Sequence, residues 1–416
     1  MIILYGGFVD LSANKGDAVH ALELTSNLRK LGNRVIVVAH ASEPRTDPDF
    51  FNTGAYGDRT RLLSRLLFFV PSFLRACRWV LCLAPACDVL YMRDYLFCTF
   101  GAVAKALYSR KIIWEVNGIA GLERAQGPHP LNFLALPLIN LLERLAGKSA
   151  DRIAPVSKGV MDVLLARGCP RSRVVLLENG VNVEMFAGGD FEARVIENEK
   201  KRFGIPASVP IIGYVGAIRP WQGLDVLVLA AREVKRRGID VRFLVVGGGE
   251  GLSAVKDEAE AEGVADIFVF TGSVEYERVP LMLALSDVCV APFTGGRAAS
   301  PMKVYEYMAS GIPMVASRIP GLEFIEEKGL GRLVDPGDSA MLADSLVDLL
   351  GNRGNTEEMA VRAREDVVRN HSWLSVARKA EALCVETAAG SRSARRLAYA
   401  RRPAFQTLSS RQGLIS

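Results

Sequence analysis

The sequence predicts an α/β protein with two successive doubly wound, Rossmann-like domains. Three observations support this prediction. The chain has 416 residues, which is long for a single hydrophobic core. Half of its residues are hydrophobic, as a buried sheet covered by helices requires. Short β-rich runs alternate with amphipathic helical segments in the first half, and this alternation begins again after about residue 205.

The first expected domain covers residues 1–190. Six short apolar runs rich in β-formers are interpreted as strands: residues 1–5, 34–39, 88–92, 111–115, 153–156 and 174–178. An amphipathic helix is expected from about residue 17 to residue 31, and Gly32 can end it. Residues 186–203 are polar and charged, and we interpret them as the connection between the domains.

The second expected domain covers residues 205–370. Its expected strands are residues 211–215, 241–246, 267–271, 288–291 and 313–316, and its expected helices are residues 223–237, 250–262, 279–284, 341–350 and 357–369. Ligands of such sheets bind beyond the carboxyl ends of the strands. We therefore expect the two sheets to face a central cleft that holds the site.

The net charge of +5 is concentrated at the end of the chain. Residues 390–416 contain six arginines and no acid, which leaves the remainder one charge negative. A basic tail of low apolar content is expected to be disordered, and it could touch anionic lipid or nucleic acid. The rest of the chain has no zinc-finger spacing and no basic-aromatic repeat, so we expect no nucleic-acid partner.

Cysteine usage and hydropathy indicate a cytoplasmic protein. The seven cysteines are odd in number and form no CxxC pair, so we expect free thiols in the cores. No run of 18 apolar residues is present, so we expect no spanning helix. The first residues have no basic leader and no small-residue cleavage site, and they are interpreted as a strand rather than an export signal.

The segment from residue 300 to residue 317 predicts a capped helix followed by a buried strand. Ser300 is a good cap, Pro301 suits the first turn, and Gly311 can end the helix. A helix start with Lys303 in its first turn is a natural seat for a phosphate. Glu306 lies on the neighbouring face, where a carboxylate can accept from sugar hydroxyls. The alternative is an ordinary capped helix with a lysine–glutamate pair.

Two further groups of residues could hold a ligand in the first domain. Gly16 permits a close backbone approach before the first helix, and His20 lies one turn inside that helix. Glu115 and Asn117 end a strand, where they could hydrogen-bond a sugar. The alternatives are a plain strand-to-helix loop, a packing histidine and an Asn-Gly turn.

The second domain offers two more loops. Arg219 and Gln222 follow its first strand and could reach a phosphate or a sugar. Residues 247–251 form a glycine-rich loop that matches a dinucleotide fingerprint only weakly, because no acidic strand end follows at the required distance. Close packing in a turn explains these glycines equally well.

We expect no metal site. Asp47 and Asp49 form a DxD pattern in a proline-containing loop, but three-residue patterns arise by chance, and the four histidines are scattered at positions 20, 40, 129 and 371.

Residues 59–78 could lie on a membrane. They hold five arginines and no acid among many leucines and phenylalanines, as an interfacial element on anionic lipid does. The alternative is a core helix whose arginines extend to the surface.

These pieces together resemble the retaining family-4 glycosyltransferases of the GT-B fold. The resemblance extends to about residue 386, and residues 372–388 resemble the helix that returns the chain to the first domain. Its landmarks are residues 16–20, 115–118, 178–182, 216–223, 247–251, 270–274 and 300–306. The combination is specific, although each piece alone is not.

The resemblance implies a metal-independent transferase that uses a nucleoside-diphosphate sugar and needs no cofactor. The residue matching Glu306 holds the ribose, the segment at Val274 meets the base, and the loop at Gly16 closes over phosphate. The helix start holds the diphosphate, and this function maps to Ser300, Pro301, Met302 and Val304. The acceptor and sugar side maps to Asp17, His20, Glu115 and Asn117.

Two departures from the family pattern affect the site. Ala298 stands where the family has a glutamate, so donor-sugar contacts cannot be transferred. Ala217 and Gln222 replace the usual arginine and lysine of the phosphate loop. Arg219 and Lys303 are the cations left for catalysis, with Gln222 beside the phosphate.

We therefore expect sugar transfer to a glycan or lipid-linked acceptor, as in exopolysaccharide synthesis, at the inner membrane face, with residues 59–78 and 390–416 touching anionic lipid. A soluble acceptor stays open. The alternatives are a non-catalytic nucleotide-sugar binder and a nucleotide-sugar 2-epimerase. A dinucleotide oxidoreductase is disfavoured because its acidic ribose reader is missing.

Overall fold

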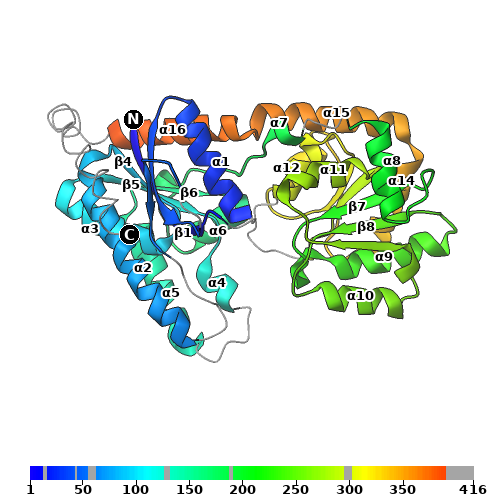
Figure 1. Ribbon diagram of the computed structural model, residues 1–416, viewed down its shortest axis with the longest axis horizontal. Helices are drawn as coiled ribbons and strands as arrows, with labels where there is room; N and C mark the ends of the chain where they lie inside the picture. Colours follow the sequence, from blue (N-terminus) through cyan, green and yellow to red (C-terminus); the bar gives the residue numbers. More distant parts are fainter. Residues whose placement is uncertain are drawn as a thin grey trace. The chain divides into compact units, whose positions relative to one another are not determined.

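The computed structural model describes residues 1–12, 16–42, 45–54, 62–125, 132–186, 191–294 and 302–389 (Figure 1). Contacts divide the chain into two compact units. The first comprises Met1–Asn179 and the described part of Leu374–Ser416, and the second comprises the described parts of Gly180–Arg297 and Pro301–Trp373. Each unit has its own sheet, so the expected fold class of two doubly wound α/β domains is confirmed.

The first unit is built on a parallel sheet with the strand order β3-β2-β1-β4-β5-β6. The strand order reverses between β1 and β4, and the carboxyl ends of these strands therefore flank the usual ligand position of such a sheet. The strands are β1 (Ile2–Asp10), β2 (Arg34–His40), β3 (Phe50–Asn52), β4 (Val89–Met92), β5 (Lys111–Val116) and β6 (Arg152–Pro155).

Helices cover both faces of this sheet. They are α1 (Gly16–Lys30), α2 (Leu62–Leu83), α3 (Tyr95–Tyr108), α4 (Ala120–Ala125), α5 (Asn132–Ser149), α6 (Lys158–Ala166) and α16 (Trp373–Ala389). Because parallel crossovers are right-handed, the steps from β3 toward β6 place α2, α3 and α5 on one face. The reverse step from β1 to β2 places α1 on the other face. Helix α3 contacts both α2 and α5 (Figure 1).

The second unit repeats this plan with the strand order β12-β11-β10-β7-β8-β9, again parallel throughout. Its strands are β7 (Ile211–Val215), β8 (Arg242–Val246), β9 (Phe268–Gly272), β10 (Val288–Ala291), β11 (Met314–Ser317) and β12 (Arg332–Val334). Its helices are α7 (Val183–Phe186), α8 (Ala193–Arg202), α9 (Leu224–Arg236), α10 (Leu252–Ala261), α11 (Val279–Ala284), α12 (Met302–Ala309), α13 (Glu323–Glu327), α14 (Ser339–Gly351) and α15 (Arg353–Asn370).

An aspartate anchors the central strand pair in both units. Oδ2 of Asp88 accepts from the amide of Ile2 at 2.7 Å, and Oδ2 of Asp287 accepts from the amide of Ile211 at 2.9 Å. The amide of each aspartate donates in return to the carbonyl of the same partner, at 2.8 Å in both cases. The first strand of each unit is thereby fixed to its neighbour at the end remote from the candidate site.

The sheet of the second unit is buried on both faces. One cluster of apolar side chains packs under α11 and α12, and another packs under α9 and α14. All five residues of β7 are buried, as are all four of β10 and of β11. A strand covered on both faces has no polar side, which explains why these segments form unbroken apolar runs in the sequence.

Two expectations about elements are wrong. Residues 174–178 form no strand of their own. Val174 bridges to Ile153 at the sheet edge, and the amides of Val175 and Leu177 donate to the carbonyls of Ile153 and Pro155, both at 2.9 Å. Residues 186–203 are not simply a connection, because α8 forms within them. Its Glu, Lys and Arg residues are good helix formers, and Glu197 pairs with Lys201 one turn on.

The cysteines and one apolar helix also differ in part from expectation. All seven cysteines are free, and Cys82 is exposed, whereas four are buried as expected: Cys87, Cys98, Cys289 and Cys384. Among the described residues, Phe69–Ala86 is long and apolar enough by composition to cross a membrane, where the sequence analysis expected no such stretch. Ala76 and Val80 of this stretch are fully buried in the core of the unit, and 28% of the stretch is buried in all.

Candidate active site

Lys303 is the centre of a polar cluster in the second unit. It lies in the first turn of α12, where its Nζ donates to the hydroxyl of Tyr214 at 2.8 Å and to Oε1 of Gln222 at 2.5 Å. The ammonium also lies 4.1 Å from the ring centroid of Tyr214 and 5.3 Å from that of Phe293. Among the described residues, no carboxylate lies within 4.0 Å of it. Neutral dipoles and aromatic faces therefore hold this cation without a contacting counter-charge.

Two glycines make room for this cluster. Gly216 has φ 146°, and a Cβ there would lie 2.9 Å from both Cε and Nζ of Lys303. Gly247 has φ 138°, and a Cβ there would lie 2.0 Å from the carbonyl oxygen of Gly216. The loops after β7 and β8 therefore pack backbone to backbone, and this packing requires glycine.

Glu306 lies one turn after Lys303 on α12. Its side chain is buried, and Oε1 accepts from the hydroxyl of Tyr276 at 3.0 Å. Tyr276 is in turn packed edge-on against the ring of Phe186. Among the described residues, the neutral Tyr276 hydroxyl thus orients a carboxylate that has lost most of its water.

Burial shifts both charged groups toward neutrality. It raises the pKa of Glu306 to about 7, against the opposing effects of the Tyr276 hydroxyl and of Lys303. It also lowers the pKa of Lys303 to about 7, against the opposing effect of Glu306. An anion beside Lys303 and hydroxyl donors beside Glu306 would favour the charged form of each. The cluster is therefore electrostatically incomplete without a ligand.

The other expected residues of the donor side lie in different settings. Gln222 touches Lys303, and Met302 and Val304 form the first turn of α12, where Val304 is fully buried. Val274 follows β9 and is half-buried against the core that includes α12. Ser300 and Pro301 lie outside the described residues.

Arg219 is not brought to Lys303. Its guanidinium lies 3.9 Å from the carboxylate of Glu250, and both side chains are largely exposed. Arg219 also stacks over the ring of Trp221 at 5.3 Å. This arginine therefore lies on the outside of the two glycine loops.

His20, Glu115 and Asn117 converge in the first unit. Nε2 of His20 lies 2.9 Å from Oε1 of Glu115, and the side-chain amide of Asn117 donates to the same oxygen at 2.8 Å. Nδ1 of His20 lies 2.6 Å from Oδ1 of Asn179. The carboxylate is completely buried, and the histidine is nearly so.

Neighbouring charges keep Glu115 ionised despite this burial. Burial alone would raise its pKa, but His20, Arg93 and the Asn117 hydrogen bond outweigh burial and lower the pKa to about 2. Arg93 also donates to the carbonyl of Asp17, at 2.5 Å. The cluster in the first unit is therefore internally compensated.

A cavity of about 220 Å³ lies at the carboxyl ends of these strands. Asp17, Glu115 and Asn117 line it, together with Arg93 and Trp114. Gly16 is the exposed first residue of α1, next to Asp17. The structure thus places four of the expected acceptor-side and loop residues around or beside one cavity.

The DxD pair is engaged elsewhere. Asp47 lies 2.7 Å from Arg29, and Asp49 lies 2.7 Å from Arg34. Within the part of the chain that the structure describes, no group of three or more histidine, cysteine or acidic side chains could hold a metal ion.

Four residues of these clusters were missed by the sequence analysis: Tyr214, Tyr276, Arg93 and Asn179. Asn179 lies in a segment recognised only as a landmark, and it reaches His20 across 159 positions of sequence. Tyr276 comes two residues after Val274, and this proximity was the one sequence signal that pointed to Tyr276. The others carry no local pattern that distinguishes them from core aromatics or surface bases.

Two family models match the chain. The model described as Glycosyltransferase Family 4 matches residues 15–185, and the model described as Glycosyl transferases group 1 matches residues 209–352. The chain belongs to the family-4 type of glycosyltransferases. The two matched ranges contain Glu115 and Lys303, so they include the central residues of both clusters.

Relatives of this glycosyltransferase act on several acceptors according to their names. It is 28% identical over 302 residues to the GDP-mannose-dependent alpha-(1-6)-phosphatidylinositol monomannoside mannosyltransferase of Mycolicibacterium smegmatis. This match covers 71% of this chain and 74% of the relative. It is 31% identical over 228 residues to the D-inositol 3-phosphate glycosyltransferase of Corynebacterium urealyticum. This match covers 53% of this chain and 53% of the relative.

Solved structures share the fold of this glycosyltransferase. Sucrose-phosphate synthase from Thermosynechococcus elongatus superposes with a TM-score of 0.75 at 20% identity, over 94% of this chain and all of the other. Anabaena HepE in complex with UDP and glucose superposes with a TM-score of 0.69 at 17% identity, over 92% of this chain and 98% of the other.

Proposed function

We propose that this glycosyltransferase moves a sugar from a nucleoside-diphosphate sugar to an acceptor hydroxyl, with retention at the anomeric carbon. The observation that carries the proposal is Lys303, a half-buried cation without a contacting carboxylate among the described residues, one helical turn from the buried Glu306. The names of the relatives support a donor of this class, because one is called GDP-mannose-dependent and one structure contains UDP and glucose.

In this proposal the donor's diphosphate supplies the counter-charge of Lys303. Gln222 and the first-turn amides of α12 at Met302 and Val304 bind the same group, and Arg219 is the second, exposed cation. Glu306 accepts from the ribose hydroxyls while Tyr276 orients it. The base lies at Val274, and Gly16 of the first unit is proposed as a phosphate-binding residue.

The reaction forms one bond and breaks another. The acceptor oxygen bonds to the anomeric carbon, and the bond from that carbon to the diphosphate oxygen breaks with its electron pair leaving on the diphosphate. The acceptor proton passes to a leaving phosphate oxygen on the same face of the sugar. Lys303 stabilises the charge that develops there. We propose this step without a metal ion or a cofactor.

The acceptor side of the proposal is the cavity in the first unit. Asp17, Glu115 and Asn117 line it, and His20 fixes Glu115 from behind. We propose a lipid-linked acceptor at the cytoplasmic face of the membrane, as in exopolysaccharide or similar glycan synthesis. Of the two segments expected on anionic lipid, residues 390–416 lie outside the described residues, and residues 59–78 are described with their side chains only from Phe69 on.

One observation favours a second candidate, a non-catalytic nucleotide-sugar binder. Ala217 and Gln222 stand at positions that are cationic in the family pattern, and Arg219 contacts Glu250 instead of the Lys303 cluster. A binder of this kind would retain donor affinity and lack turnover. A 2-epimerase would instead convert the donor without any acceptor.

The test begins with the thermal stability of the full chain in the presence of GDP-mannose, UDP-glucose and ADP-glucose. A true donor binds the folded state and raises Tm further as its concentration increases. The enzyme is then incubated with that donor, labelled in its sugar, and with a membrane lipid extract, in the presence and absence of EDTA. Labelled glycolipid whose anomeric carbon keeps the donor's configuration in NMR supports the proposal, whereas binding without product supports the binder.

A further inference from the structure

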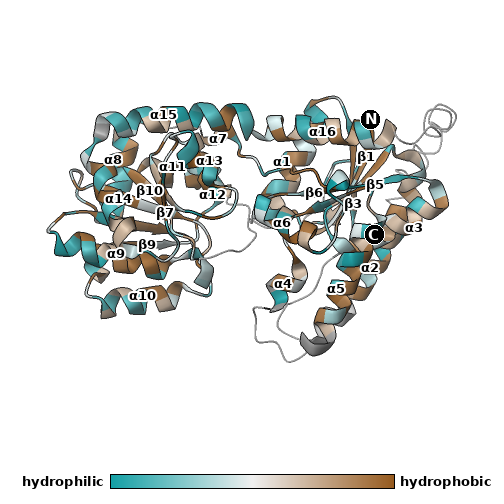
Figure 2. Cartoon of the chain, turned by 180° about the vertical axis from the view of Figure 1, so that it is seen from behind, coloured by the Kyte–Doolittle hydropathy of each residue, from teal (hydrophilic) through white to brown (hydrophobic). Residues whose placement is uncertain are grey.

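Exposed apolar side chains gather on one face of the first unit. The described residues include sixteen exposed large hydrophobic side chains, and nine of them lie on α2, α3 and α5. Figure 2 shows long brown, hydrophobic stretches along α2 and α5. These nine are Phe69, Val70, Leu74, Val103, Leu107, Tyr108, Leu138, Leu141 and Leu145. We call this surface the α2–α3–α5 face. Apolar patches of this kind mark sites of protein or membrane association.

The helical spacing of these residues shows that they point away from the sheet. Leu138, Leu141 and Leu145 follow one another at intervals of three and four residues, so they form one stripe along α5. Their neighbour Ala146 is fully buried toward the core. The stripe ends at the exposed Lys148, in the last turn of α5.

The charge of the three helices is one-sided. Their sequences contain a single acid, Glu143, and it is buried 2.7 Å from Arg167. They contain six bases: Arg65, Arg75, Arg78, Lys105, Arg144 and Lys148. The outer surface of the layer therefore combines leucines with cations and presents no acid among its described side chains.

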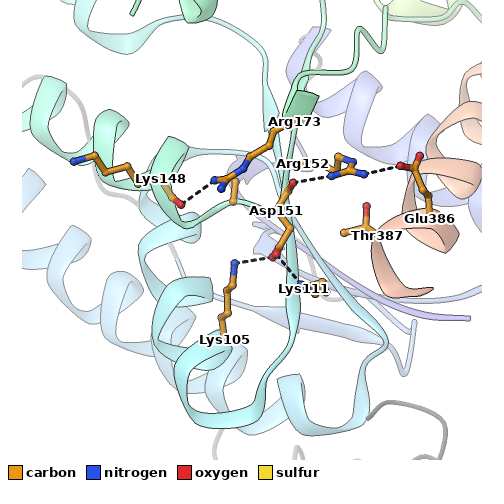
Figure 3. A pocket seen from close by; sticks show the side chains of 9 residues that line it. Lys105, Lys111, Lys148, Asp151, Arg152, Arg173, Glu386 and Thr387 are labelled. Atoms are coloured by element: carbon orange, nitrogen blue, oxygen red, sulfur yellow. Dashed lines mark hydrogen bonds and ion pairs between the residues drawn. The ribbon is translucent and has the colours of Figure 1, made fainter. Parts of the chain in front are cut away.

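A basic pocket of about 300 Å³ adjoins the ends of α3 and α5 (Figure 3). Five bases line it, namely Lys105, Lys111, Lys148, Arg152 and Arg173, against the two acids Asp151 and Glu386. Lys105 and Lys111 share the one carboxylate of Asp151, at 2.8 and 3.0 Å. Some of these bases also cap helix ends, since Lys105 donates to the carbonyl of Ser149. Lys148 and Arg173 have no described carboxylate within 4.0 Å, and they stay available to an anion.

We propose that the α2–α3–α5 face docks on an anionic phospholipid bilayer, with the basic pocket against the headgroup phosphates. On such a surface the leucines bury their side chains at the acyl boundary, and the neighbouring cations are attracted to the phosphates. A second copy of the chain fits less well, because a two-fold interface pairs this face with itself, and the face carries bases without an exposed described acid to pair with them.

Docking along the length of α3 and α5 would hold both ends of α3 at the lipid, the basic pocket at its carboxyl end and the candidate acceptor cavity at its amino end. Tyr95 at the start of α3, Ala120 at the start of α4 and Glu143 on α5 all line that cavity. Leu122 on α4 is exposed beside it. A lipid-linked acceptor could then enter without leaving the bilayer. This last step rests on the proposed function, whereas the docking itself does not.

The test measures co-sedimentation of the full chain with vesicles of phosphatidylcholine alone and with vesicles that also contain phosphatidylglycerol. The double variant Leu138→Glu, Leu141→Glu is expected to partition at least about tenfold more weakly onto the mixed vesicles. The matched control is Val361→Glu, Val368→Glu on α15, two exposed valines of the second unit, which should bind as the wild type does. Unchanged thermal unfolding establishes that both variants fold.

A second arm tests the charge. Lys148→Gln with Arg173→Gln should lose about fivefold in affinity per base on the mixed vesicles, and nothing on phosphatidylcholine alone. Lys201→Gln, an exposed lysine of the second unit, is the control. The proposal is overturned if the leucine variant sediments like the wild type, or if that variant instead abolishes a concentration-dependent dimer. Donor-induced Tm shifts measured without vesicles should be equal in all variants, so failure of docking is distinguishable from failure of sugar transfer.

Discussion

The polar clusters of the two units treat buried charge in opposite ways. In the first unit the carboxylate of Glu115 has His20 at 2.9 Å and Asn117 at 2.8 Å, and its pKa falls to about 2. In the second unit the ammonium of Lys303 donates to two neutral groups and has no described carboxylate within 4.0 Å, and its pKa falls to about 7. Burial is common to both sites, so compensation by neighbours is the difference.

This difference indicates which cluster needs a ligand. A compensated pair is stable alone and can fix the shape of a cavity, as His20 and Glu115 do beside Asn117. An uncompensated charge costs free energy until an opposite charge arrives, and it therefore favours a ligand that brings one. The same reasoning predicts opposite responses to mutation in the two units.

The largest expected effect is on catalysis in the second unit. Lys303→Met keeps the apolar stem and removes the charge, so we expect kcat/KM for the donor to fall by about 100- to 1,000-fold. The free energy of unfolding should change by less than about 1 kcal/mol, because a poorly compensated charge is removed. Steady-state kinetics and urea denaturation measure the two effects.

Lys256→Met is the matched control, since Lys256 also lies over an aromatic ring, that of Phe270, but is exposed. It should leave both quantities unchanged. A strong loss of stability in Lys303→Met with normal donor kinetics would make Lys303 a structural residue and remove the contrast between the units.

The second effect is on stability in the first unit. Glu115→Gln removes the buried carboxylate that His20, Arg93 and Asn117 stabilise, so we expect a loss of about 3 kcal/mol in the free energy of unfolding near neutral pH. Because the folded-state pKa lies below the ordinary value of 4.5, this contribution is present above pH 4.5 and is lost as the pH falls toward 2. Urea denaturation at several pH values should show the gap between variant and wild type closing over that range.

Glu233→Gln provides the control for burial. The pKa of Glu233 is also lowered to about 2, by hydrogen bonds from Arg236 and Arg237, but this pair lies on the surface of α9. Solvent screens such a pair, so its loss should barely move the unfolding curve. Equal effects of the two substitutions would show that burial is not what distinguishes Glu115.

The sequence predicted the fold better than it predicted the site. Parallel strands buried on both faces form unbroken apolar runs, so the cores of both sheets were recognised without a structure. The three-residue strands β3 and β12 were missed because so short a run has no periodicity of its own. The strand prediction for residues 174–178 was wrong, because this apolar segment makes only an isolated bridge and two backbone hydrogen bonds to the edge of the sheet among the described residues.

The local helix pattern identified Lys303 and Glu306, because both belong to one helical turn. It could not identify Tyr214 or Tyr276, which reach that turn from 89 and 30 positions away. The partnership of His20 with Glu115 was missed for the same reason. Long-range contacts of single side chains leave no periodic signal, so the sequence indicates His20 and Glu115 only as separate candidates.

A third test gives Glu306 the opposite pH response to Glu115. Burial raises its pKa to about 7, so the ionised form in the wild type costs stability increasingly as the pH rises from 4.5 through 7. Glu306→Gln carries no such cost and should gain stability relative to the wild type over that range in urea denaturation. It should also lose about tenfold in donor affinity, measured by calorimetry, because an amide accepts ribose hydroxyls less strongly. Parallel pH curves for both enzymes would mean that Glu306 is compensated like Glu115.

The smallest expected effect concerns the Tyr276 hydroxyl, which donates to Glu306. Tyr276→Phe removes the hydroxyl that lies 3.0 Å from Oε1 of Glu306 and leaves the ring against Phe186. The hydrogen bond that orients the carboxylate is lost, at a cost of about 1 kcal/mol in donor-binding free energy. We expect the donor KM to rise about fivefold with kcat unchanged, because the ribose contact is equal in the ground state and the transition state. Tyr108→Phe on α3 is exposed and serves as the control. A fall in kcat instead would place Glu306 at the reacting bond, and the two clusters would then differ in chemistry as well as in charge compensation.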